Sequence, residues 1–263
     1  MYKKTLCGLL AAAALSLPAQ GARAAHTVPV QVDGFPLETV CYLEDGVTYV
    51  PLRTLLDTLG GWELRWDGAS RSAVGSGDGH WLTACPASGT VTLDGETRTG
   101  RVFLESGRTY VPLRAMAELL GGGAEWDPYL GGAAMTSGSA GYDAAELYWL
   151  SRIISAESRG EPLEGQIAVG NVVLNRVDSR DFPDTIPDVI FDQEDGIQFE
   201  PVGNGTVYQT PTDQSVEAAM RVLDGEEVLE GAMFFYAPAL SPGTWINENR
   251  TYLTSIGCHR FYL

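Results

Sequence analysis

One stretch decides the fold of the second half of this chain: AESRGEPLEGQIAVGNVVLNRV, residues 156–177. It joins two apolar helical patterns through a short turn that contains Gly160 and Pro162. At 100° per residue, the apolar residues of the first pattern fill one broad arc and the polar residues take the opposite side. The arc comprises Leu147, Trp149, Leu150, Ile153, Ile154 and Ala156, and the opposite side comprises Tyr148, Ser151, Arg152 and Ser155. Glu157 falls at roughly 280° from Leu147, inside the apolar arc.

A carboxylate that faces a core is uncommon unless it is paired or used chemically. Burial disfavours the charged form and raises the pKa of the carboxyl group, as a general acid working near neutral pH requires. The alternative is a helix-end Glu157 whose side chain escapes to solvent at the turn. The geometry of the projection alone leaves both interpretations open.

The sequence around this stretch predicts a mostly helical unit over residues 142–263, with a small β part. Asp143 suits the N-cap of the first helix, and Thr212 suits that of a later helix. The second helix, about residues 164–177, is apolar nearly all round and should be central. Gln166 and Asn175 on this helix must find hydrogen bonds, and we interpret both as structural polar groups. The glycine-rich segment 192–209 is a candidate for one wall of a cleft, and residues 233–236 and 252–262 for short strands.

Five blocks of this unit, in order, resemble the signature of the SleB/CwlJ cell wall hydrolases. They are the 156–177 stretch, Gln198-Phe199-Glu200-Pro201-Val202, Phe234-Phe235-Tyr236-Ala237-Pro238, Trp245-Ile246 and Ile256-Gly257-Cys258-His259-Arg260-Phe261-Tyr262. Three positions depart from the family pattern. Glu200 stands where Ser is usual, and Ala237 and Cys258 stand where Asn is usual.

The resemblance implies a lysozyme-like arrangement of helices around the helix that carries Glu157. It also implies a lytic transglycosylase that acts on peptidoglycan glycan strands with one catalytic carboxyl group and without a cofactor. Glu157 would protonate the oxygen between N-acetylmuramic acid and N-acetylglucosamine, and its carboxylate would then deprotonate the C6 hydroxyl of the sugar. The product would carry a 1,6-anhydro ring.

Other residues of the matching blocks are candidates for the same site. Phe199, Tyr236 and Trp245 are candidates for stacking on sugar rings, and Gln198 for orienting the substrate. We interpret His259 as a structural hydrogen-bonding group. The roles of Glu161 and Glu164 are interpreted as charge complementation at a helix end, in exposed positions.

Glu200 raises a second possibility for the reaction. Paired with Glu157 across a water, its carboxylate would permit an inverting glycoside hydrolase, for which the separation is about 6.5–9.5 Å. A third possibility is a wall-binding or spore-structural protein with a degenerate hydrolase fold, suggested by the three departures. The intact Glu157 weighs against that third interpretation.

The first half of the chain contains a repeat of about 61 residues within residues 25–135. Thr48-Tyr49-Val50-Pro51-Leu52-Arg53 recurs as Thr109-Tyr110-Val111-Pro112-Leu113-Arg114. Each copy predicts strands that end in Asp-Gly or Ser-Gly turns, a short helix closed by Gly-Gly, and a strand around Trp66 or Trp126. The small polar residues 136–141 are typical of a linker.

This repeated unit resembles the copper amine oxidase N-terminal-like domain, a small α+β module. The chain has three His residues, His26, His80 and His259, too few for a His-rich copper site in this segment, so no metal is expected. A structural role for the module is favoured over wall anchoring or substrate positioning. The predicted fold class of the whole chain is α+β.

Residues 1–24 have the charged start, apolar run and Ala-Arg-Ala end of a secretory signal. We therefore expect secretion to the cell wall or spore envelope, with no membrane span after cleavage. The sequence has 17 basic and 34 acidic residues, a balance that argues against nucleic acid as a partner. Protein partners are not predicted. Cys41, Cys85 and Cys258 fit no zinc site, and a Cys41–Cys85 bridge and free thiols both stay open.

Overall fold

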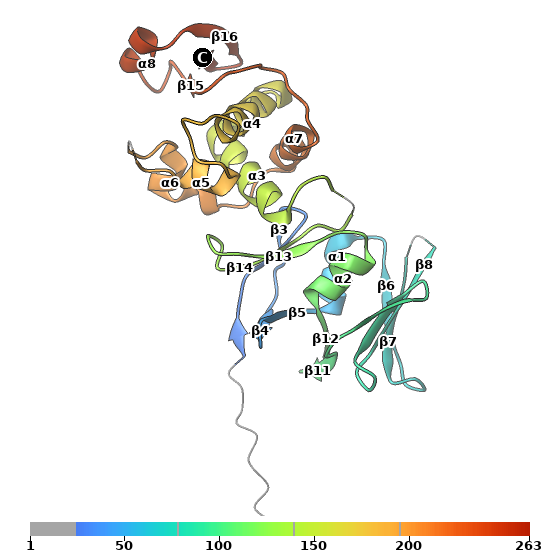
Figure 1. Ribbon diagram of the computed structural model, residues 1–263. Coiled ribbons are helices and arrows are strands. Elements are labelled where there is room, and N and C mark those ends of the chain that lie inside the picture. The colour runs from blue at the N-terminus through green and yellow to red at the C-terminus, as the bar shows by residue number, and fades with distance from the viewer. Residues whose placement is uncertain (1–24, 78, 139, 195) are drawn as a thin grey trace, which may run out of the picture.

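The computed structural model describes residues 25–77, 79–138, 140–194 and 196–263 (Figure 1). The expected signal peptide lies outside the described residues. A strand-rich module precedes a mainly helical unit, so the prediction of an α+β chain is confirmed. None of the described helices is long and apolar enough to cross a membrane.

The module comprises three sheets and two short helices. Its first part contains β1 (His26–Thr27), β2 (Val30–Val32), β3 (Phe35–Pro36), β4 (Tyr42–Glu44), β5 (Val47–Pro51), α1 (Leu52–Leu59), β6 (Glu63–Asp67) and β7 (Ser72–Gly77). After β8 (His80–Cys85), the second part contains β9 (Thr90–Leu93), β10 (Glu96–Thr99), β11 (Phe103–Glu105), β12 (Arg108–Pro112), α2 (Leu113–Leu119), β13 (Ala124–Asp127) and β14 (Gly132–Met135).

The Asp-Gly and Ser-Gly pairs form the hairpin turns of both copies. In the β2–β3 turn, Asp33 and Gly34 have φ values of 49° and 84°. Positive φ at both central residues is typical of the two-residue turns whose twist matches that of antiparallel strands. The same pattern recurs at residues 45–46, 94–95 and 106–107. Local turn chemistry therefore produces the same four hairpins that the repeat predicts.

The two repeat copies share strands in every sheet of the module. In the central sheet, ordered β1-β4-β5-β12-β11, the two Tyr-Val-Pro segments pair antiparallel, with Val50 opposite Val111. The sheet β10-β9-β8-β7-β6 joins the hairpin that begins the second copy to the one that ends the first. The sheet β13-β14-β2-β3 joins the hairpin that ends the second copy to the one that begins the first. Neither copy therefore completes a sheet by itself.

The second unit surrounds α3 (Ala144–Ser158) and α4 (Leu163–Val177) with shorter elements. These are α5 (Ile186–Phe191), α6 (Glu200–Asn204), the 3₁₀ turn Thr206–Tyr208, α7 (Asp213–Leu223), α8 (Thr244–Asn249) and the strands β15 (Phe234–Tyr236), β16 (Tyr252–Ile256) and β17 (His259–Tyr262). The strands form a sheet in the order β15-β17-β16. The expected N-caps are confirmed: Asp143 and Glu146 form a capping box, and Thr212 accepts from the Ser215 N–H.

Close helix packing holds α3, α4 and α7 together. A Cβ atom at Gly170 of α4 would lie 2.9 Å from Ile154 Cδ1 of α3 and 2.9 Å from Val222 Cγ2 of α7. Only a glycine lets the three helices approach so closely without a shift. The prediction that this apolar helix is central is confirmed, since most of α4 is buried.

α3 also packs on the strand-rich module, against β13 and β14 (Figure 1). Trp149 Nε1 donates to Asp127 Oδ2 over 2.5 Å. Arg152 Nη1 donates to the Gly34 carbonyl oxygen over 3.0 Å, and its guanidinium carbon lies 3.7 Å from the centroid of the Tyr148 ring. The residues that the helical projection places opposite the apolar arc are buried like the arc itself. A second protein surface therefore covers this face of α3.

The segment between the two units is tied to the same hairpin. The backbone N–H and the hydroxyl of Ser137 donate to the Asp33 carboxylate over 2.8 and 2.6 Å. Because Asp33 and Gly34 form the β2–β3 turn, one hairpin tip binds both the linker and α3. Cys41, Cys85 and Cys258 are free thiols, so the alternative of a Cys41–Cys85 bridge is wrong.

Replacement of Arg152 tests the contact between the two units. Arg152→Ala removes the stack on Tyr148 and leaves the Gly34 carbonyl oxygen without its donor in a buried interface. We expect a loss of about 2 kcal/mol in the free energy of unfolding, measured by denaturant titration. The control Arg65→Ala, at an exposed strand position, should change it by less than about 0.5 kcal/mol. Equal effects of the two variants would contradict the interface.

Candidate active site

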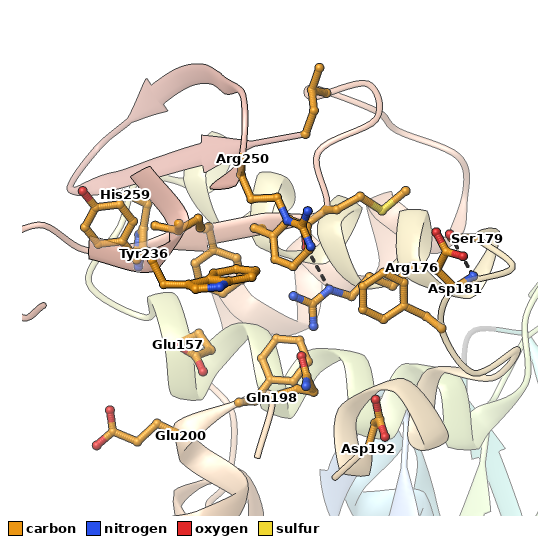
Figure 2. Close-up of a pocket in the computed structure, with 18 of the residues that line it drawn as sticks. Glu157, Arg176, Ser179, Asp181, Asp192, Gln198, Glu200, Tyr236, Arg250 and His259 are labelled. Atoms are coloured by element: carbon orange, nitrogen blue, oxygen red, sulfur yellow. Dashed lines mark hydrogen bonds between the residues drawn. The ribbon is translucent and has the colours of Figure 1, made fainter. Parts of the chain in front are cut away.

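A cleft of about 1330 Å³ opens at the carboxyl-terminal end of α3 (Figure 2). One wall comes from the end of α4 and the loop that follows it, and another from Asp192, Glu194 and residues 198–200. The β15 strand and α8 supply the remaining side. Segments far apart in the sequence therefore meet here, and all five resemblance blocks contribute residues to the lining.

Glu157, the penultimate residue of α3, places its carboxyl group in this cleft. The pKa of Glu157 is raised from 4.5 to about 7, mainly by burial and also by the nearby Glu200 carboxylate, while Arg176 opposes the shift. Figure 2 shows Glu157 and Glu200 at the same end of the cleft. No described residue donates a hydrogen bond to the Glu157 carboxyl, which is thus available to a ligand. This half-buried, weakly acidic group has the properties of a general acid.

Arg176 is a site residue that the sequence analysis does not single out. Its side chain, on α4, is 5% exposed, and its Nε donates to the Met233 carbonyl oxygen over 2.8 Å. Three aromatic rings surround the guanidinium, with centroids 4.9 Å (Phe182), 5.1 Å (Phe199) and 5.4 Å (Phe234) from its central carbon. Burial lowers the pKa of Arg176 to about 10, so the group stays charged at neutral pH. An arginine within an apolar helix is the signal that would have found it.

Two of the three expected stacking residues have a ring open to the cleft. Trp245 on α8 is 58% exposed, and Tyr236 on β15 is half-buried, with its hydroxyl accepting from Asn247 Nδ2 over 2.9 Å. Phe199 is only 2% exposed and belongs to the core, so the expectation that it stacks on a sugar is wrong. Its ring packs toward Arg176 and Phe235 and shapes the floor of the cleft.

The predicted polar residues occupy different places. Gln198 lines the cleft, where its Nε2 donates to the Gly196 carbonyl oxygen over 3.3 Å. Gln166 is buried away from the cleft and accepts from the Ser215 hydroxyl over 2.8 Å. Asn175 donates to the Ala232 carbonyl oxygen over 3.0 Å. The contacts of Gln166 and Asn175 join α4 to α7 and to the segment before β15, as bracing residues would.

His259 lines the cleft, and Glu161 lies behind it. His259 is buried, and burial lowers its pKa, although the Glu161 carboxylate 3.8 Å away opposes this shift. The interpretation of Glu161 as an exposed charge is wrong, because its side chain is only 10% exposed. It accepts from the Cys258 N–H over 2.8 Å at the β16–β17 turn. This hydrogen bond joins the turn after α3 to the β16–β17 hairpin, which is distant in the sequence and near only in the folded chain.

Comparison with known proteins finds a match for each of the two units. Residues 160–262 match the Cell Wall Hydrolase family, and residues 31–131 match the Copper amine oxidase N-terminal domain. The cell wall hydrolase CwlJ of Oceanobacillus iheyensis is 30% identical over 114 residues, which cover 41% of this chain and 79% of that relative. The chain belongs to the cell wall hydrolase family. Among the residues that the structure describes, no cluster of His, Cys, Asp and Glu side chains is suited to holding a metal ion.

Relatives named as spore cortex-lytic enzymes match over a smaller share of their length. The spore cortex-lytic enzyme of Halalkalibacterium halodurans is 34% identical over 126 residues, covering 48% of this chain and 37% of that enzyme. The chain thus spans well under half of the length of such relatives. The solved catalytic domain of the germination-specific lytic transglycosylase SleB from Bacillus anthracis is 33% identical, and the match covers 47% of this chain and 98% of that domain with a TM-score of 0.43.

The raised pKa of Glu157 predicts a pH-dependent stability. Between pH 4.5 and about 7 the folded chain holds a proton on Glu157 that the unfolded chain releases, so stability falls as the pH rises through this window. Glu157→Gln removes the buried charge. We expect the variant to gain on the order of a few degrees in Tm over the wild type at pH 8, and less at pH 5.5. A gain that is equal at both pH values would contradict a buried, titrating carboxyl.

Proposed function

We propose that this protein is a secreted peptidoglycan-degrading enzyme that cleaves the bond between N-acetylmuramic acid and N-acetylglucosamine. We further propose that it acts as a lytic transglycosylase in the cell wall or spore envelope. The observation that carries the proposal is Glu157, a half-buried carboxyl with a pKa near 7 in a large cleft. Membership of the cell wall hydrolase family supports it, and so do the relatives named as spore cortex-lytic enzymes.

In this mechanism Glu157 serves first as the acid and then as the base. Its carboxyl proton moves to the glycosidic oxygen as the bond from that oxygen to C1 of the muramic residue breaks. The carboxylate then accepts the proton of the C6 hydroxyl of the same residue, while O6 bonds to C1. The products are a free 4-hydroxyl on the leaving strand and a 1,6-anhydro ring. No water is consumed, and Glu157 recovers its proton.

The environment of Glu157 suits both steps. Burial keeps the carboxyl protonated near neutral pH before the reaction, and Arg176 favours the carboxylate that forms when the proton leaves. Trp245 and Tyr236 present aromatic faces on the opposite side of the cleft, where the apolar faces of pyranose rings can stack. Gln198 is proposed to orient the glycan by hydrogen bonds from its own wall of the cleft.

One observation favours a second mechanism on the same bond. Glu200 lines the cleft and lies close enough to raise the pKa of Glu157. As a general base, its exposed carboxylate would activate a water on the other face of the sugar, giving an inverting hydrolase with a reducing end as product. The identity of the product ends therefore separates the two mechanisms.

Mass spectrometry of fragments released from purified peptidoglycan and spore cortex tests the reaction. We expect the wild-type protein to release muropeptides that end in 1,6-anhydro-muramic acid. Glu157→Gln should lower the rate of release by several orders of magnitude, because the proton donor is gone. Glu200→Gln is the matched control and should retain the anhydro products. Reducing ends that disappear with Glu200→Gln would favour the hydrolase. Absence of release from both substrates would leave a wall-binding protein with a degenerate site.

The pH dependence of turnover checks the role of Glu157 independently. Because the protonated form of Glu157 is the active one, kcat should fall about tenfold per pH unit above a pH near 7. Initial rates on soluble glycan fragments measure this dependence. Arg176 is the residue that lowers the pKa of Glu157, so Arg176→Met should move this descending limb to higher pH. A limb unmoved by Arg176→Met would show that the titrating group is not Glu157.

A further inference from the structure

Three arginines line the cleft of a chain in which acidic residues outnumber basic ones by 34 to 17. They are Arg176, Arg180 and Arg250. Elsewhere, arginines such as Arg98, Arg101 and Arg221 form ion pairs with glutamates. None of the three cleft arginines forms an ion pair with a carboxylate of a described residue. Three cationic groups without a carboxylate partner thus line the site where the substrate is proposed to bind.

Arg176 and Arg250 lie against the same aromatic ring. The guanidinium carbon of Arg250 is 4.4 Å from the Phe234 centroid, and that of Arg176 is 5.4 Å from it. Arg250 also lies 4.9 Å from the Trp245 ring. Stacking on a ring fixes the plane of a guanidinium and leaves the N–H groups at its edge free for an acceptor. Figure 2 shows both guanidinium groups in the middle of the cleft.

The hydrogen bonds of these arginines are incomplete. Of the Arg176 nitrogens, only Nε has an acceptor among the described residues, and Nη1 is buried without one. A buried donor without a partner costs free energy, and an incoming acceptor recovers it. Asp181 on the loop after α4, and Asp192 and Glu194 on the facing wall, form no ion pair with either guanidinium. Asp192 attracts Arg176 at longer range.

We propose that Arg176 and Arg250 form a subsite for a carboxylate carried by the muramic residues of the glycan. The inference rests on the proposed function. N-acetylglucosamine is neutral, whereas a muramic residue carries a carboxylate on its lactyl group or on the peptide attached to it. The Glu200 carboxylate, which lies beside Glu157, repels such an anion from that end of the cleft. The subsite therefore sets the register of the alternating strand, so that the muramic side of the bond meets Glu157.

Charge removal on both partners tests this contact. The substrate is a soluble peptidoglycan fragment, native or with its carboxylates converted to amides by carbodiimide and ammonia. Arg250→Gln should raise KM about tenfold on the native fragment, because a charge-assisted contact is lost, and by less than about twofold on the amidated one. Arg250→Lys should raise KM less than Arg250→Gln does, since lysine keeps the positive charge but not the two parallel N–H donors of the guanidinium. Arg65→Gln, the same charge change far from the cleft, should leave both KM values unchanged.

The two sources of the carboxylate are separated with a third substrate. Glycan strands stripped of peptide by an amidase keep only the lactyl carboxylate. The lactyl carboxyl is an uncharged amide wherever the peptide is attached, so an Arg250→Gln penalty that grows on stripped strands identifies the lactyl carboxylate as the ligand. A penalty that disappears on stripped strands identifies a carboxylate of the peptide. An equal penalty on native and amidated fragments would overturn the subsite.

Binding to the Glu157→Gln variant gives a readout that does not need turnover. Calorimetry should show weaker binding of amidated than of native fragments, and Arg250→Gln in the same background should remove this difference. Failure of the proposed function would appear as no product from wild-type protein on any substrate. Failure of the subsite would appear as binding that ignores amidation, whether or not product forms.

Discussion

The burial of α3 on two sides is the constraint on which the rest of the structure depends. Its apolar arc packs on α4 and α7, and its polar side packs on the β13-β14-β2-β3 sheet and the turn at Gly34. A helix held along both faces has little freedom to tilt, so its last turn is fixed relative to both units. Glu157 lies in that last turn. The position of the carboxyl group is thus set by contacts far from the cleft.

The two buried charges of the cleft depend on each other. Burial raises the pKa of Glu157 and lowers that of Arg176, and the attraction between the two groups opposes both shifts. They lie on different helices, α3 and α4, whose separation is set by the close approach at Gly170. Packing of small residues in the core is therefore part of the electrostatics of the site. A shift of α3 relative to α4 would change the distance between Glu157 and Arg176, and thereby the pKa of Glu157.

Structural features that depend on residues close together in the chain could be predicted from the sequence. The N-caps at Asp143 and Thr212, the Asp-Gly turns and the central position of α4 depend on residues close together in the chain. The projection also places Glu157 on the buried side of its helix without any knowledge of what covers it.

Features with distant partners could not be predicted. The burial of Arg152 depends on a hairpin more than a hundred positions away, and that of Glu161 on the turn at Cys258. Phe199 was misjudged because an aromatic residue beside a cleft and one beneath it look alike in sequence. Arg176 was missed because helical periodicity shows that it interrupts an apolar surface but not that aromatic rings surround it.

The exchange of hairpins between the two repeat copies has a consequence for how the module arises. Two copies that complete each other's sheets have the organisation of an intertwined dimer whose halves are joined by one covalent segment, β8. Each half meets its partner at an effective concentration on the order of millimolar, set by the tether and independent of the amount of protein. Assembly that would be bimolecular for separate copies becomes unimolecular here. The surface that receives α3 can therefore form even in dilute solution, where separate halves would rarely meet.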